Sequence, residues 1–125
     1  MNENALSHEI LGAAIDVHKE LGPGLLESVY EEGLIIELYS RGLTVARQRE
    51  LVLTYKGREL QSKLRLDLVV NDLVIVEVKA IERLASIHES QLLTYLRLAN
   101  KRLGLLINFN ATTLKNSIRR VVNNL

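Results

Sequence analysis

Two carboxylates and a lysine, close together in the chain, are the residues of this sequence best suited to chemistry. Nine residues separate Asp67 from Glu77, and Val78 alone separates Glu77 from Lys79. Hard cations such as Mg²⁺ bind oxygen ligands, typically one or two protein carboxylates together with a substrate phosphate. A nearby ammonium can orient or deprotonate the attacking water and offset developing negative charge. The three residues therefore indicate metal-assisted hydrolysis of a phosphate ester, although this spacing also occurs by chance in many hairpins.

The hydrophobic pattern around these residues predicts how they face each other. Apolar residues alternate over 59–70 and 73–80, which predicts two strands of a hairpin. A two-residue turn at Asn71-Asp72 would mix aliphatic and charged side chains on each face. A three-residue loop at 71–73 instead pairs Asp67 with Glu77, and the register follows the buried face. The other face is then wholly aliphatic, with Leu64, Leu66, Leu68, Val70, Val74, Val76 and Val78.

Two carboxylates in this register would have Cβ atoms about 5 Å apart and would repel each other unless a positive charge lies beside them. Lys79 and Arg65 could supply that charge, and so could a metal ion. From the residues alone, a salt-bridge ladder across the hairpin and a metal site are equally supported.

Length and charge restrict the function classes. The 125 residues predict a single domain, 1–125, and its 16 basic and 15 acidic residues create no global attraction to nucleic acid. Any such contact must rest on a local patch. The absence of cysteine excludes disulfides, thiolate zinc sites and a cysteine nucleophile. No apolar run approaches a membrane span, and the polar N-terminus is unlike a secretory signal, so we expect a cytoplasmic protein without membrane contact. Basic residues gather in the strands (Arg47, Arg49, Lys56, Arg58, Lys63, Arg65) and near the C-terminus (Lys115, Arg119, Arg120).

Periodicity along the chain predicts the order α-α-β-β-β-α-β-α. Helical spacing predicts helices over 5–21 and 25–41, and alternation predicts strands over 47–55, 59–70 and 73–80. A capping box beginning at Ser86 predicts a third helix to about residue 100, followed by a strand over 103–109 buried on both faces. Thr112 or Thr113 would cap a last helix. This order predicts an α/β (α+β) protein with a mixed four-stranded sheet and helices on both faces.

Further polar residues lie on the predicted helices. Glu27 and Tyr30 share one side of the second helix, although the dipole of the first turn alone would explain Glu27. His88, Gln91 and Tyr95 form a polar stripe on the third helix, which begins close after the strand carrying Glu77. No other histidine lies at ligand spacing from His88, so a histidine-based metal site is not expected.

Several separated motifs together resemble a known family. The segment 24–30, GLLESVY, matches the G-x-x-E-x-x-Y signature of the GxxExxY proteins, a small branch of the PD-(D/E)xK nuclease superfamily. The resemblance continues through residues 65–67, 77–80, 88–96 and 104–110, and so covers nearly the whole chain. It implies a restriction-endonuclease-like core, α-β-β-β-α-β, here with additional N- and C-terminal helices. Leu66 stands where the superfamily name places a proline.

The resemblance also implies roles for individual residues. Asp67, Glu77 and the backbone carbonyl of Val78 would bind Mg²⁺ or Mn²⁺, and Lys79 would position the water. Glu27 would complete the site, in part through water. The residues Gln91 and Tyr95 resemble the Q-x-x-x-Y pair that lies against the active site in RecB-like nucleases.

A Mg²⁺-dependent nuclease acting on DNA or RNA is therefore the expected function. The alternatives are a non-catalytic nucleic-acid-binding module and a protein-interaction module on the same fold. A homodimer is a further expectation, because a domain this small would gain groove area by pairing.

Overall fold

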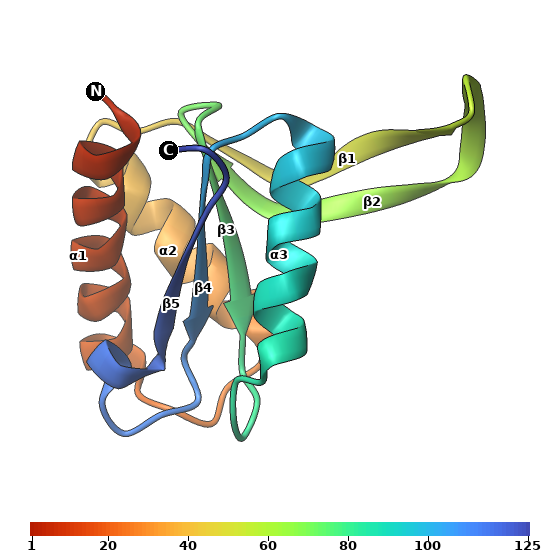
Figure 1. Ribbon diagram of the computed structural model, residues 1–125. Coiled ribbons are helices and arrows are strands. Elements are labelled where there is room, and N and C mark those ends of the chain that lie inside the picture. Colours follow the sequence, from red (N-terminus) through yellow and green to blue (C-terminus); the bar gives the residue numbers. More distant parts are fainter.

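The computed structural model describes all 125 residues and contains one mixed sheet between helices (Figure 1). The strand order is β1-β2-β3-β4-β5, and every neighbouring pair is antiparallel except β3 and β4, which are parallel. The elements are α1 (Glu3–Leu21), α2 (Glu27–Ser40), β1 (Val45–Tyr55), β2 (Arg58–Val70), β3 (Val74–Lys79), α3 (Ser86–Ala99), β4 (Leu103–Asn108), the 3₁₀-helix η1 (Leu114–Ser117) and β5 (Ile118–Val122). None of the helices has the length and apolar character needed to span a bilayer.

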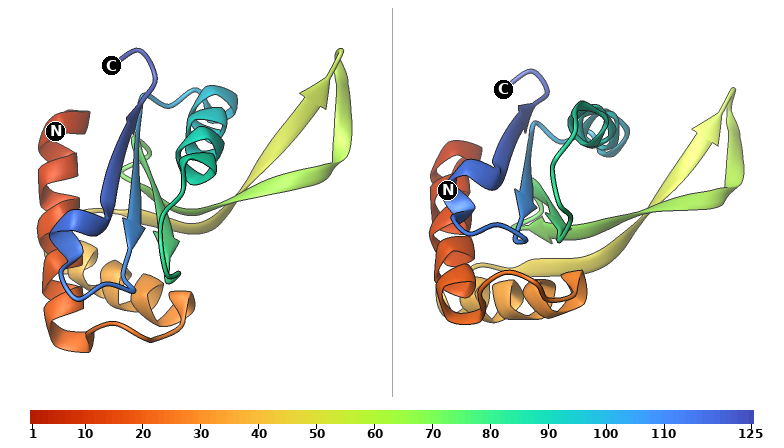
Figure 2. Two further views of the ribbon diagram at one scale, coloured as in Figure 1. Left: turned by 60° about the horizontal axis from the view of Figure 1, so that its bottom comes forward. Right: turned by 90° about the horizontal axis from the view of Figure 1, so that it is seen from below.

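Helices cover both faces of the sheet, as the sequence predicts. Helices α1 and α2 pack on one face over the larger hydrophobic cluster, and α3 packs on the other over a smaller one (Figures 1 and 2). The crossover through α3 is what allows β3 and β4 to run parallel. Both strands are buried on both faces, so their sequences are mostly apolar without alternation, and the polar residues Glu77, Lys79 and Asn108 lie toward their C-terminal ends. The strand ends of β3 and β4 at Lys79 and Asn108 therefore lie side by side.

The C-terminal segment differs from the prediction. Instead of a last helix, η1 leads into β5, which pairs antiparallel with β4 and makes the sheet five-stranded. The apolar spacing of this segment fits a helix, but Ile118, Val121 and Val122 are β-branched and favour extended backbone. The open edge of β4 also offers unpaired backbone groups, which β5 satisfies.

The start of α3 also differs in detail. Helix α3 begins at Ser86 itself, and the residue before it, Ala85, is the N-cap. The Nδ1 atom of His88 accepts a hydrogen bond from the Ala85 amide at 2.9 Å. His88 therefore makes the back-bond that a glutamate makes in the usual capping box.

Strands β1 and β2 continue past the sheet as a two-stranded arm that projects from the body (Figures 1 and 2). Pairing of β2 with β3 covers only Leu68–Val70, whereas β1 pairs with β2 almost throughout. Gln48 has a φ of 50° near the base of this arm, and such a left-handed residue turns the strand locally. Leu66, expected on the same face as Leu68, packs instead in the cluster beneath α3.

The closest approach between α3 and the sheet predicts a contrast between two glycines. A Cβ atom at Gly104 would lie 2.9 Å from Leu92 Cγ in the core, whereas one at Gly12 would meet only the flexible tip of Arg41. We expect Gly104→Ala to lower the free energy of unfolding by about 1–3 kcal/mol, because the core must be overpacked. Gly12→Ala should be neutral or should stabilise by up to about 1 kcal/mol through helix propensity. Urea unfolding of both variants measures this, and equal shifts would contradict the close packing of α3.

Candidate active site

The hairpin formed by β2 and β3 has the register that the aliphatic pattern predicts. Val70 pairs with Val74, so the loop comprises Asn71, Asp72 and Leu73, and its first two residues have φ values of 51° and 54°. Leu68 pairs with Val76, and the same register places Asp67 opposite Glu77. This is also the point where the pairing of β2 with β3 ends.

Backbone amides hold both carboxylates at this point. Asp67 Oδ2 accepts a hydrogen bond from the Val78 amide at 2.9 Å, and the Asp67 amide lies 3.4 Å from Glu77 Oε1. The two acidic side chains therefore share one small site at the fork between the strands.

Burial makes this pair electrostatically costly. Glu77 is only 6% exposed. Loss of solvation, followed by the negative charge of Asp67, raises the pKa of Glu77 to about 8, while the charge of Lys79 acts in the opposite direction. Neither carboxylate forms an ion pair with Lys79, Arg65 or any other basic side chain. The salt-bridge ladder considered from the sequence is therefore absent.

The first turn of α2 brings Glu27 to the same strand end. Glu27 Oε2 accepts a hydrogen bond from the amide of Ala80, the residue that directly follows β3. The residues of the GLLESVY segment fix this position. The Tyr30 hydroxyl donates to the Gly22 carbonyl at 2.5 Å and accepts from the Leu25 amide at 3.1 Å, which closes the loop before α2. Gly24 has a φ of 93°, a conformation that favours glycine.

The ring of Tyr30 anchors this loop to the core. It is fully buried and stacks on Phe109, with ring centroids 4.6 Å apart and planes 9° apart. Phe109 directly follows β4, so the loop that begins α2 is attached to the strand end beside the site. The glycine and the tyrosine of the segment are thus structural, and Glu27 is the residue they position.

A buried glutamate that the sequence reasoning missed connects three elements. Glu31, one turn after Glu27, is 6% exposed and accepts hydrogen bonds from Arg47 Nε at 3.3 Å and Gln48 Nε2 at 3.0 Å. Gln48 Nε2 also lies 3.4 Å from Asp67 Oδ1. The amide of Gln48 therefore bridges Glu31 and Asp67. Glu31 follows Glu27 by four residues on the same helix, and this spacing was the signal by which the sequence could have indicated it.

A second residue outside the predicted set secures the chain after β3. Asn108 is buried at the end of β4; its Oδ1 accepts from the Ile81 amide at 3.1 Å and its Nδ2 donates to the Ile81 carbonyl at 2.9 Å. Asn108 pairs with Lys79 in the sheet. It fixes the turn through which Lys79 and Ala80 leave the sheet.

Helix α3 contributes unequally to this site. Partial burial raises the pKa of the Tyr95 hydroxyl, and the negative charges of Glu77 and Asp67 raise it further, which places Tyr95 in the field of the acidic pair. Gln91, one turn earlier on the same side of the helix, is exposed. His88 is occupied as a helix cap.

The donors at this strand end are all hard oxygen ligands. No group of three or more His, Asp or Glu side chains is gathered closely enough to enclose a metal ion. Mg²⁺, however, usually binds through one or two carboxylates and keeps waters or phosphate oxygens as its other ligands. Asp67 and Glu77 satisfy this requirement, and the proton that burial retains on the pair is one that a cation would replace. The residues present therefore fit a divalent cation.

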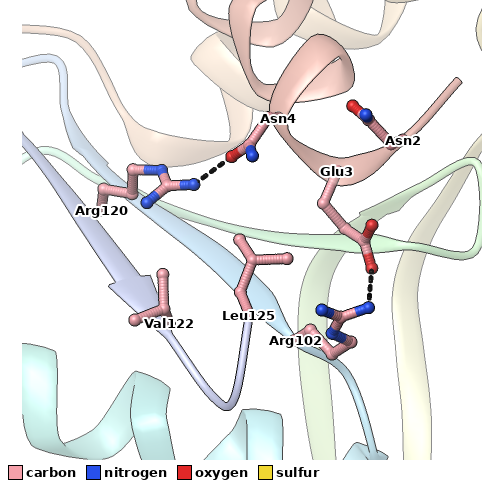
Figure 3. Close-up of a pocket in the computed structure, with 7 residues that line it drawn as sticks. All are labelled: Asn2, Glu3, Asn4, Arg102, Arg120, Val122 and Leu125. Carbon is pink, nitrogen blue, oxygen red and sulfur yellow. Dashed lines mark hydrogen bonds and ion pairs between the residues drawn. The ribbon is translucent and has the colours of Figure 1, made fainter.

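The largest cavity of the structure, 520 Å³, lies elsewhere (Figure 3). It forms where the two termini meet, and it contains none of the predicted site residues. Arg120 reaches Asn4 across it, and Arg102 lies 4.0 Å from Glu3. Its lining consists of Asn2, Glu3, Asn4, Arg102, Arg120, Val122 and Leu125. Because this lining holds one weak ion pair and no group of acidic or nucleophilic residues, the strand end and not the cavity is the candidate site.

The fold is a mixed sheet flanked by helices on both faces, with Glu77 and Lys79 on β3 and Asp67 beside them on β2. The chain matches the family model of the PD-(D/E)XK nuclease superfamily over residues 4–121 and belongs to this superfamily. Searches of curated proteins and of solved structures gave no match. The narrower assignment to the GxxExxY branch stays a prediction.

The role of Tyr30 can be tested against a second tyrosine of the same helix. Tyr30→Phe removes two hydrogen bonds of a buried hydroxyl and should lower the free energy of unfolding by about 1–2 kcal/mol. Tyr39→Phe removes one 3.3 Å bond at an exposed position and should change it by less than about 0.5 kcal/mol. Denaturant unfolding measures both, and equal effects would show that the loop before α2 does not depend on Tyr30.

The raised pKa of Glu77 predicts an unusual dependence of stability on pH. Folding raises this pKa from 4.5 to about 8, so between these values the folded chain holds a proton that the unfolded chain has lost. In metal-free buffer, stability should therefore fall as pH rises from about 4.5 to 8 and level off above, by a total on the order of a few kcal/mol. Glu77→Gln should lack this slope and unfold at higher temperature than the wild type at pH 8. Parallel melting curves for the two proteins across this range would contradict the assignment.

Proposed function

We propose that the protein is a nuclease that uses a divalent cation, Mg²⁺ or Mn²⁺, to hydrolyse phosphodiester bonds in DNA or RNA. Membership of the PD-(D/E)XK nuclease superfamily supports the reaction class. The observation that carries the proposal is the buried Glu77 beside the half-buried Asp67, both held by backbone amides without a basic partner. Such a pair is unfavourable for a purely structural role and favourable for a cation site.

Each residue at the strand end has a role in this proposal. Asp67 and Glu77 hold the cation, with the Val78 carbonyl and, through water, Glu27 as further ligands. A bound cation stabilises negative charge on the phosphate and lowers the pKa of the attacking water. Glu31 and Gln48 hold Asp67 in place, because the Gln48 amide bridges the two carboxylates.

Lys79 and helix α3 act on the substrate side. Lys79 ends β3 beside Glu77 and is half-buried, so its ammonium can orient the water and offset charge on the phosphate. Tyr95, in the field of the acidic pair, orients the site by its hydroxyl, and the exposed Gln91 is free to contact the phosphate.

The arm provides the local positive patch that nucleic-acid binding requires. Residues 45–66 contain six basic and two acidic residues, a net charge of +4, whereas the whole chain has +1. Lys56, Arg58 and Arg65 have no carboxylate partner within the chain. Phosphate contacts from such residues make affinity fall with rising salt concentration.

Thermal melting with and without millimolar Mg²⁺ or Mn²⁺ tests the cation site directly. A ligand that binds only the folded state adds about 2.7 kcal/mol when its concentration is 100 times its Kd. We expect the wild type to be stabilised by the metal and Glu77→Gln to be unaffected. Glu59→Gln, which removes an exposed carboxylate from the arm, is the matched control and should respond like the wild type.

Cleavage assays on single- and double-stranded DNA and RNA follow from the same variants. Activity should require the metal and should fall by on the order of 10²-fold or more in Glu77→Gln and Asp67→Asn, whereas Glu20→Gln, which removes an exposed carboxylate of α1 outside the arm, should leave it unchanged. Salt-dependent binding of nucleic acid without cleavage, in a wild type that does bind metal, would favour the non-catalytic binding module instead. Absence of both metal stabilisation and nucleic-acid binding would favour the protein-interaction module.

A further inference from the structure

The arm carries an edge strand that nothing in the chain covers. Strand β1 is the first strand of the sheet, so its outer side has no partner. Beyond Gln48 the arm consists of β1 and β2 alone (Figure 2). An isolated two-stranded ribbon is marginally stable in water, and three or more strands with an apolar face are needed for independent stability. A long uncovered edge is also a template for pairing with another chain.

One face of this arm is apolar. Leu51 pairs with Leu64 across the two strands. The register of β1 against β2 shifts between Val52 and Thr54, but the burial along β1 still alternates and places Leu53 on the same side as Leu51. All three leucines are half-buried, yet none packs in either core cluster. Tyr55, next on this face, is 62% exposed. This leucine stripe, formed by Leu51, Leu53 and Leu64, is therefore only partly shielded from water, and no other element of the chain covers it.

We propose that a second copy of the chain pairs with this edge, β1 against β1 in antiparallel register centred on Val52. In this register Leu51 lies opposite Leu53 of the partner subunit, so the two leucine stripes join into one apolar face. Arg49, whose guanidinium is paired with Asp72 of its own chain at 2.6 Å, lies opposite the partner's Tyr55. Glu50 meets the partner's Thr54, and no like charges face each other. The two arms then form a four-stranded ribbon.

The same register carries the tip of each arm to the other chain's acidic site. Lys56 lies opposite the partner's Gln48, and in each chain the Gln48 amide lies 3.4 Å from Asp67 Oδ1. Within its own chain Lys56 has no carboxylate partner and lies 5.5 Å from the Tyr55 ring centroid. The pairing thus places a basic tip beside carboxylates that have no ion pair of their own. A contact of Lys56 with a substrate phosphate would rest on the proposed nuclease function. The pairing of the two β1 strands does not rest on it.

Single cysteines test the register, because the chain contains none of its own. Val52→Cys places the two thiols at directly facing positions, where Cβ atoms are about 4.5–5.5 Å apart and a disulfide can form with small adjustment. Mild oxidation should convert it to a species of twice the 14.1 kDa chain mass on a non-reducing gel. Thr54→Cys is the matched control, since its two thiols would be offset by four residues, about 13 Å, and should not join. The double variant Glu50→Cys, Thr54→Cys should cross-link again.

The mass in solution gives a second measurement that needs neither metal nor nucleic acid. Light scattering should give a dimer for the wild type and a monomer for the double variant Leu51→Lys, Leu53→Lys. Leu98→Lys, which changes an exposed leucine of α3, should leave the dimer intact. Melting curves show that the variants remain folded.

A monomeric wild type at sub-millimolar concentration, or equal cross-linking of Val52→Cys and Thr54→Cys, would overturn the proposal. A dimer that survives Leu51→Lys, Leu53→Lys would overturn it as well. None of these results bears on cleavage, so failure of the pairing and failure of the nuclease proposal are distinguishable.

Discussion

The repulsion between Asp67 and Glu77 is the constraint on which the rest of the site depends. Aliphatic packing sets the register of β2 against β3, and this register brings the two carboxylates opposite each other. Burial then makes the ionised pair unfavourable, which is why Glu77 retains a proton well above its usual range of pH. Core packing therefore stabilises an arrangement that electrostatics opposes, and a bound cation is the simplest way to relieve that opposition.

The surrounding elements limit how far this strain can relax. The Val78 amide holds Asp67 from one side and the Gln48 amide holds it from the other, through Glu31 of α2. Helix α2 is fixed in turn by Tyr30, whose hydroxyl closes the preceding loop and whose ring stacks in the core. A movement of the acidic pair would thus have to disturb the hairpin, the arm and the helix together. Such mutual restraint is what preorganises a site for catalysis.

Features set by repeated local patterns were predictable from the sequence, and features set by a single residue or by an open edge were not. The hairpin register followed from a face of seven aliphatic side chains, and the mixed sheet followed from the order of elements. The segment from Ile118 to Val122 has apolar spacing that fits either a helix or a strand. It forms a strand because its backbone pairs with the otherwise open edge of β4. The bridge from Glu31 to Asp67 depends on the left-handed conformation of Gln48, which no periodicity indicates. Leu66 packs beneath α3 and not with Leu68, which the alternation along β2 does not indicate either.

The position of the basic residues on the arm bears on how the acidic site could work. Under the proposed function the acidic site acts on a polyanion, yet the only basic side chain that β3 brings to it is Lys79. Three basic residues without an ion pair, Lys56, Arg58 and Arg65, lie on the arm, and the arm extends away from the body of the protein, as both views in Figure 2 show. Within one chain, the tip could therefore touch only nucleic acid that extends far beyond the site. In a β1-paired dimer the same tip lies beside the partner's carboxylates. One contact would then cover the leucine stripe and bring the ammonium of Lys56 to the partner's acidic site.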